Sequence, residues 1–213
     1  MKRTNAMKRL IVSLTTFSFV AAAAADNEKE IFKPGDHCVA YRTVKDIWFA
    51  FDVEIIGRNC EVTASLVAPN GANGPRIAVE VPIKDFKSRN FMRNRTVAGL
   101  LGVKTQPNLR FTSSPIDVEG LRVDIARGRF RLPGNLSFGG KDFPLEFPLE
   151  IFEHEGQRYV TGRLSTTFAA FEIEVPTVAG GLIARPHEVL ELIVHLKLER
   201  VDGFEDWAQE QGL

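Results

Sequence analysis

The chain has 213 residues, of which 44% are hydrophobic and 25% charged, the balance of an ordinary globular protein. Its 27 basic and 27 acidic residues cancel, so the basic footprint that nucleic-acid binding requires is absent. Phenylalanine is over-used, with 16 residues against 2 Trp and 2 Tyr. That many phenylalanines can fill a core or line an apolar cavity, and composition leaves both open.

Residues 1–25 have the pattern of a secretory signal peptide. A positive n-region precedes an apolar stretch at 10–20 and a run of alanines that offers cleavage sites. The apolar run is shorter than the ~20 residues of a spanning helix. We therefore expect export to the periplasm, and not an integral membrane protein after cleavage. Without its four basic residues the mature chain has 23 basic and 27 acidic residues, a formal net charge of −4.

Residues 26–36 form a charged leader without clear periodicity. The chain then alternates apolar and polar residues, which is typical of half-buried β-strands. Strands are predicted over residues 38–44, 47–55, 60–66 and 77–83. A bend at 57–59 and a loop at 69–75 separate them, as their Gly, Asn and Pro content indicates.

One helix is predicted from Ser88, a suitable N-cap, to Gly102, a suitable C-cap. Its apolar stripe is short and has arginines beside it. Gly99 within the stripe costs roughly 1 kcal/mol relative to alanine. We expect a short helix that lies over one end or the rim of a barrel.

The second half of the chain again predicts strands, here at 109–113, 121–132, 134–138, 143–151, 159–171 and 189–201, followed by a polar tail at 202–213. The best-marked pair is a hairpin around Gly139 and Gly140, because glycine takes positive φ without steric cost. Pro144 and Pro148 share the outer face of the strand that follows. Since proline donates no ladder hydrogen bond, this strand is expected to be at an edge, bulged or irregularly paired.

About eight or nine strands with short connections predict an all-β, antiparallel fold. Open sheets of that size leave edges that invite aggregation, and closure removes them. A closed or nearly closed barrel of eight strands is just wide enough for side chains or one small ligand. An outer-membrane barrel fits poorly, because acidic residues such as Asp52, Glu54, Glu146 and Glu150 lie on the outer face, where an apolar lipid-facing band would be required.

No set of residues predicts catalysis or a metal site, so neither an enzyme nor a cofactor is expected. The histidines are scattered, and His195 is predicted to be a solvated residue on the outer face of the last strand. Cys38 and Cys60 are an even pair in a chain with an export signal. They can form a disulfide or remain two buried thiols, and the sequence leaves both open.

Four segments together resemble the YceI-like family. Residues 134–149 resemble its Gly-x-Leu-x-apolar-x-Gly turn followed by Pro-Val-x-Leu-Pro, and Phe168–Ile173 resembles its Asp-Phe-Gly-Ile segment without the Asp and Gly. Ser88–Arg95 resembles Arg-Asp-x-x-Met/Leu-Arg, with Asn90 in place of the acid. Residues 107–114 match Pro-x-apolar-x-Phe-x-Ser, with Gln106 in place of the preceding Tyr.

The resemblance covers residues 37–201, which we take as one YceI-like lipid-binding domain. It implies an eight-stranded, lipocalin-like up-and-down barrel with one short helix. It also implies an exported protein that holds a polyisoprenoid or isoprenoid quinone in its interior. Storage, transport and stress protection are roles consistent with such a protein.

Apolar residues of the strands and the helix are the candidates for lining that interior. They are Phe49, Phe51, Phe91, Met92, Leu100, Phe111, Phe138, Phe143 and Phe147. The helix arginines Arg89, Arg93 and Arg95 are candidates for a phosphate head group, because guanidinium matches phosphate geometry. The alternative is an exported scaffold or stress protein with a filled barrel that binds a protein partner, and a homodimer also remains open.

Overall fold

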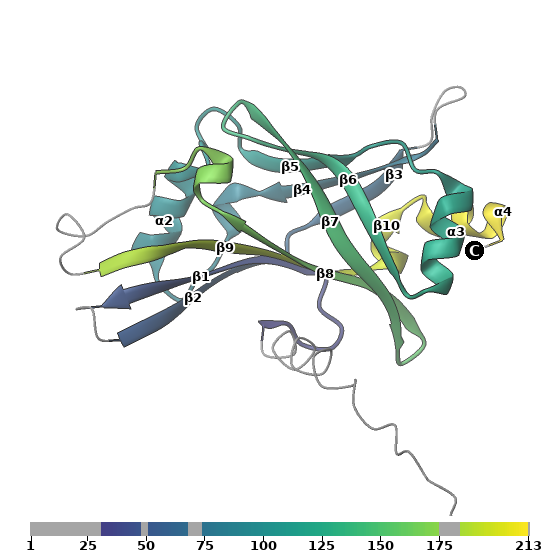
Figure 1. Cartoon of the computed structure of the whole chain (residues 1–213), viewed down its shortest axis with the longest axis horizontal. Helices are drawn as coiled ribbons and strands as arrows, with labels where there is room; N and C mark the ends of the chain where they lie inside the picture. The colour runs from purple at the N-terminus through teal and green to yellow at the C-terminus, as the bar shows by residue number, and fades with distance from the viewer. Residues whose placement is uncertain (1–30, 48–50, 68–73, 175–183, 213) are drawn as a thin grey trace, which may run out of the picture.

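The computed structural model describes residues 31–47, 51–67, 74–174 and 184–212. In this part of the chain ten strands form one curled sheet, a half-barrel with helices at its two ends (Figure 1). The strands are β1 (Cys38–Ile47), β2 (Phe51–Asn59), β3 (Thr63–Val67), β4 (Arg76–Pro82), β5 (Asn108–Ser113), β6 (Arg129–Phe138), β7 (Lys141–His154), β8 (Gln157–Thr167), β9 (Ala184–Lys197) and β10 (Val201–Asp202). The all-β class is as predicted, whereas the count of eight strands was wrong.

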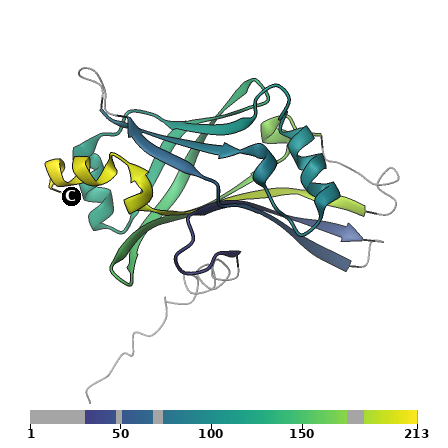
Figure 2. The same ribbon diagram turned by 180° about the vertical axis from the view of Figure 1, so that it is seen from behind.

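The helices among the described residues are α2 (Phe91–Leu100), α3 (Val118–Ala126) and α4 (Phe204–Gln211), together with the short 3-10 turns η1 (Ile83–Asp85), η2 (Ala169–Phe171) and η4 (Leu198–Arg200). The prediction of one helix was therefore also wrong. Helix α2 lies at one end of the sheet, and α3 and α4 lie at the other (Figures 1 and 2). In the described residues no helix has the length and apolar character needed to cross a bilayer.

The order of the sheet is β10-β3-β4-β5-β6-β7-β8-β9-β1-β2, and every neighbouring pair is antiparallel except β10 with β3. The chain that leaves β9 passes through η4 into β10, where Val201 pairs with Ala64 of β3. At the other edge, backbone hydrogen bonds of 3.0 and 2.9 Å join Arg58 of β2 to Lys87, which follows η1. These two connections curl the sheet round its apolar face.

The β6–β7 hairpin has the predicted form. Phe138 pairs with Lys141 across a two-residue turn, in which Gly139 and Gly140 take φ of +61° and +80°. Both central residues of such a turn need positive φ, which explains the glycines. From the turn onward, alternate residues of β7 point to the apolar side of the sheet.

The sheet is interrupted between the first half of β7 and β8, and this interruption, called the seam below, explains why β7 tolerates two prolines. Pro144 and Pro148 pair with β6, whereas the pairing of β7 with β8 begins only at Leu149 and Gly162. The first half of β7 is therefore an unpaired edge on the side of β8. A proline, which has no N–H to donate, is tolerated at such an edge. At this seam η2 places Phe171 against Phe138 and Phe143, with ring centroids 5.9 and 5.4 Å apart.

Residues 118–126 form helix α3, not the start of a strand as predicted. Leu121, Val123 and Ile125 alternate as in a strand, but the amide of Leu121 donates to the carbonyl of Asp117 at 2.9 Å, a helical bond. Gly128 follows the helix with φ of +76°. Asp before the segment and Gly after it are the start and stop signals that indicated a helix.

The boundaries of α2 also differ from the prediction. The N-cap is Asn90, whose side chain accepts a 3.0 Å hydrogen bond from the amide of Arg93. Ser88 instead donates from its hydroxyl to the side-chain oxygen of Asn94 at 2.7 Å. Arg89, between Ser88 and Asn90, has a φ of +60°, so the helix cannot extend back through it to Ser88.

Both ends of the chain contribute more to the fold than their polar composition predicts. Ile31 and Phe32 of the leader are buried against the outer face of the sheet, in a cluster with Cys38, Ala40 and Ile193. In the tail, predicted to be polar, α4 buries Ala208 and directs Phe204 and Trp207 toward the interior. The few apolar residues of each segment therefore fix its position.

Candidate functional site

An apolar cavity of about 250 Å³ lies on the inner face of the curled sheet. One water needs only roughly 10–15 Å³ of such space, so this cavity is much larger than a packing defect. Its lining includes α2 at one end of the sheet and both α3 and α4 at the other. The concave face of the half-barrel is thus not filled by side chains of the described residues, which argues against the filled-scaffold alternative.

The lining is apolar along its whole length. Most strands contribute alternate residues, which are the inward positions of a pleated sheet. The strand residues of the lining include Ala64, Val79, Val81, Leu109, Leu132, Leu145, Phe147, Val160, Leu192 and Val194. None of the described lining residues is charged, and among them Tyr41 and Trp207 alone carry a polar side-chain atom.

Helices and turns complete the lining at both ends. Val97, Leu100 and Leu101 contribute at the α2 end, together with Phe168 and Ile173, which flank η2. Leu121 of α3 and both aromatic residues of α4 contribute at the far end. Composition and alternation could have identified the inward strand residues, but not the helical ones, because their role depends on how the ends fold over the sheet.

Polar groups of Tyr41, Ser88 and Arg93 lie at the α2 end of the cavity. Tyr41 is half-buried, and its burial raises the pKa of Tyr41 although the Ser88 hydroxyl and the charge of Arg93 act in the opposite direction. Arg93 donates a 3.2 Å hydrogen bond to the carbonyl oxygen of Ser88. Of the three predicted head-group arginines, Arg93 is half-buried here, whereas Arg89 and Arg95 are exposed.

The candidate lining residues from the sequence divide into four groups. Leu100, Phe111 and Phe147 line the cavity. Phe138 and Phe143 are buried beside it, where their rings stack with centroids 4.9 Å apart and pack on Phe171, so they close the seam instead. Phe91 and Met92 are exposed on α2. Phe49 and the side chain of Phe51 lie outside the described residues.

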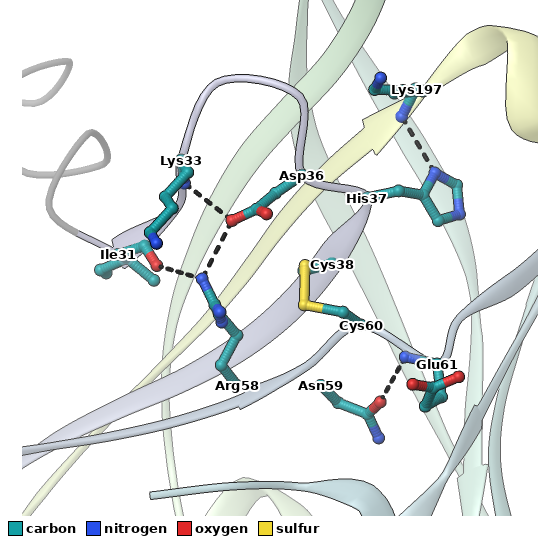
Figure 3. Close-up of a disulfide and its surroundings, with 10 residues drawn as sticks. All are labelled: Ile31, Lys33, Asp36, His37, Cys38, Arg58, Asn59, Cys60, Glu61 and Lys197. Atoms are coloured by element: carbon teal, nitrogen blue, oxygen red, sulfur yellow. Dashed lines mark hydrogen bonds and ion pairs between the residues drawn. A yellow bond between two sulfur atoms is a disulfide. The ribbon is translucent and has the colours of Figure 1, made fainter. Parts of the chain in front are cut away.

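On the opposite face of the sheet, the disulfide Cys38–Cys60 joins the start of β1 to the residue after β2 (Figure 3). The leader packs over it. Arg58 donates 2.9 Å and 3.4 Å hydrogen bonds to the Asp36 carboxylate and the carbonyl of Ile31, which hold the leader down. Of the two alternatives left open for the cysteines, the disulfide is the one observed.

Two histidines near the disulfide are shielded from solvent, with His37 buried and His195 half-buried. His195 was predicted to be a solvated outer residue, and it does lie on the outer face, but its ring stacks on Phe32 and Tyr159 at 5.3 and 5.1 Å. Burial lowers the pKa of His195. His37 accepts a 3.1 Å hydrogen bond at Nδ1 from the amide of Lys197. The sequence could not identify these contacts, because they depend on where the leader folds.

Ion pairs cover much of the outer face. Acidic residues that were read as a solvated face pair across strands, as Glu146 does with Arg131 and Glu150 with Arg129, at 3.1 and 2.9 Å. The described residues contain no cluster of His, Cys, Asp or Glu suited to a metal ion. The only site that the described residues build with a clear chemical character is therefore the apolar cavity.

The fold and the cavity together define an all-β protein of lipocalin-like form, a curled sheet with an apolar interior. A sequence model of the YceI-like domain matches residues 36–193. The chain therefore belongs to the YceI-like family. No curated protein matched the chain in a sequence comparison.

Two solved structures show the same fold. BcnA from Burkholderia cenocepacia is 20% identical, with a TM-score of 0.54 over 75% of this chain and 95% of that one. A polyisoprenoid binding domain from Saccharophagus degradans, implicated in plant cell wall breakdown, is 13% identical, with a TM-score of 0.53 over 75% of this chain and 92% of that one. At these identities the likeness establishes the fold alone.

Proposed function

We propose that this protein is an exported carrier that holds an isoprenoid-type chain, a polyisoprenoid or an isoprenoid quinone, in the cavity. The observation that carries this proposal is the uncharged lining from α2 to α4. A branched hydrocarbon chain needs no hydrogen bonds, and each buried methylene contributes about 0.8 kcal/mol. Membership of the YceI-like family and the polyisoprenoid-binding neighbour support this ligand class and a binding role rather than an enzymatic one.

The α2 end is where we place a polar head group, if the ligand has one. Tyr41 and Arg93 are the polar side chains next to the lining there. An arginine forms strong charge-assisted hydrogen bonds with phosphate, and a phenol bonds a quinone or hydroxyl oxygen. Export to the periplasm is part of the proposal and is supported by the signal-like pattern of residues 1–25.

The test is native mass spectrometry of the protein purified from its own envelope, followed by organic extraction and lipid analysis. We expect an isoprenoid lipid to be released, and the emptied protein to take up added isoprenoid lipid. An apo mass that does not change with any added isoprenoid lipid would overturn the proposal.

A pair of variants on β3 ties the binding to the cavity. Ala64 lines the cavity and its neighbour Thr63 is exposed on the other face. Ala64→Phe fills cavity space and is expected to weaken lipid binding roughly tenfold or more, equivalent to about 1.4 kcal/mol or more. Thr63→Phe adds a similar bulk outside and is expected to bind as the wild type does. Thermal unfolding of both variants would check that each is folded.

A further inference from the structure

Helix α2 exposes large apolar side chains that no described part of the chain covers. Phe91 is 71% exposed and Met92 is 58% exposed, the highest values among the large hydrophobic residues described. Leu100 on the same helix is 36% exposed, although it also contributes to the cavity lining. The exposed positions are 91, 92, 95, 96, 99 and 100, which is the spacing of one continuous helix face. Because Val97 and Leu101 face the cavity, α2 has apolar residues on both sides.

The same region is strongly basic, although the whole chain is neutral. Residues 84–104 contain six basic residues and one acidic residue, Asp85. Arg89 and Arg95 are exposed, and neither forms an ion pair with any described residue. Sheet arginines such as Arg110 and Arg129 have carboxylate partners instead. The charge at α2 is therefore left for an external partner.

Helix α4, at the opposite end of the sheet from α2 (Figure 2), is acidic. Residues 199–210, which include most of α4, contain five acidic residues and one basic residue, Arg200. Helix α3 at that end carries both signs, since Arg122 pairs with Glu119 and Arg127 with Asp124. A negatively charged surface is therefore attracted to the α2 region and repelled by α4.

We propose that the exposed face of α2 docks on the surface of an anionic lipid bilayer. Aromatic and methionine side chains enter the boundary between head groups and acyl chains, while arginines bind lipid phosphates. A helix that is apolar toward solvent and flanked by unpaired arginines has the chemistry for this contact. Docking also brings the α2 end of the cavity to the bilayer. This surface goes beyond the proposed ligand and does not depend on it.

The test is flotation of the protein with vesicles of phosphatidylcholine, with and without phosphatidylglycerol. We expect binding only to the anionic vesicles, weakening as salt shortens the range of electrostatic attraction. The double variant Phe91→Ser/Met92→Ser is expected to lose roughly tenfold or more in vesicle affinity. Arg89→Gln/Arg95→Gln is expected to lose roughly 25-fold, because each basic residue near such a surface is worth about a fivefold change.

The matched control lies at the far end, on α3. Val123 is 51% exposed and Arg127 is exposed beside it. Val123→Ser/Arg127→Gln removes one exposed apolar side chain and one exposed arginine, which is paired with Asp124 at 3.9 Å, and is expected to leave vesicle binding unchanged. Phe91→Trp gives a direct readout, since its fluorescence should be quenched by brominated lipid.

Three outcomes would overturn the proposal. The first is the absence of binding to anionic vesicles at low salt. The second is vesicle binding that the α3 control reduces as much as the α2 variants do. The third is concentration-dependent dimerisation that Phe91→Ser abolishes while vesicle binding is absent, which would make a second copy of the chain the occupant of this face.

Discussion

His37 links the stability of the fold to pH. It is 2% exposed, and its Nδ1 accepts the Lys197 amide hydrogen bond. Burial, together with the charges of Arg200 and Lys197 and against an opposing hydrogen bond to the backbone of Val62, lowers the pKa of His37 from 6.5 to about 4. The folded protein therefore holds this imidazole neutral at pH values where an unfolded chain protonates it.

The sign of the effect follows from that difference. Above pH 6.5 both states are neutral and the stability is full. As the pH falls from 6.5 to about 4, the unfolded chain gains a proton that the folded chain does not. The free energy of unfolding is expected to fall by up to about 3 kcal/mol from this residue, with little further loss below pH 4. The pKa of His195 is lowered too, which adds in the same direction.

Urea unfolding above pH 6.5 and near pH 4 measures this contribution. His37→Gln keeps a hydrogen-bond acceptor and does not titrate, so it is expected to lose less stability on acidification than the wild type. His154→Gln changes an exposed histidine and serves as the control. Identical pH profiles for His37→Gln and the wild type would contradict the prediction.

At the scale of elements, the pairing of β7 with β8 depends on a glycine at the seam. Gly162 pairs with Leu149, and a Cβ added to it would lie 2.3 Å from the carbonyl oxygen of Pro148 and 2.6 Å from the side chain of Leu149. At such a distance the backbone of β7 would have to shift, which lowers the stability of the fold. Gly162→Ala is expected to destabilise the fold by about 1–3 kcal/mol, as overpacking does.

Chemical denaturation of Gly162→Ala beside Gly99→Ala measures this cost. Gly99 lies within α2 with no atom near the added Cβ. Its replacement is expected to be neutral or to stabilise by up to about 1 kcal/mol through helix propensity. If both variants had the same stability as the wild type, the close approach at Gly162 would not constrain the seam.

The elements that sequence predicts well are those with a long, clean period. Residues 143–151 alternate over nine positions, and the structure has β7 there. Short segments were less certain, since Leu121, Val123 and Ile125 fit a strand and a helix equally until the flanking Asp117 and Gly128 are weighed. In α4, two aromatic residues among charged ones gave too weak a pattern to indicate a buried face.

For the whole molecule, the disulfide acts mainly on the unfolded chain. Cys38 and Cys60 are 22 residues apart, and closing a loop of that length restricts the unfolded ensemble by about 3 kcal/mol. Cys38→Ser/Cys60→Ser is expected to lose about that much stability in guanidinium denaturation. Reduced wild type should match the double variant. A double variant as stable as the oxidised wild type would mean that packing of the leader, and not the disulfide, stabilises this part of the sheet.

The all-β class and the inward positions of the long strands were within reach of the sequence, whereas the number of strands and helices and the ends of the cavity were not. Phe111 and Phe147 line the cavity because strand alternation directs them inward. Trp207 and Phe168 line it because distant segments fold over its ends, a tertiary result with no local signal. The exposure of Phe91 and Met92 was missed for a related reason, since periodicity identifies an apolar residue but not which side of a helix the protein covers.

The uncharged lining has a consequence for how a ligand moves. Between Tyr41 and Trp207 the described lining offers no hydrogen-bonding side chain. A hydrocarbon chain can therefore shift lengthwise, exchanging one set of dispersion contacts for an equivalent set, without breaking any polar bond. Such an interior selects its occupant by cross-section rather than by length, so chains with different numbers of repeating units would be held alike, and their direction would be set only at the ends.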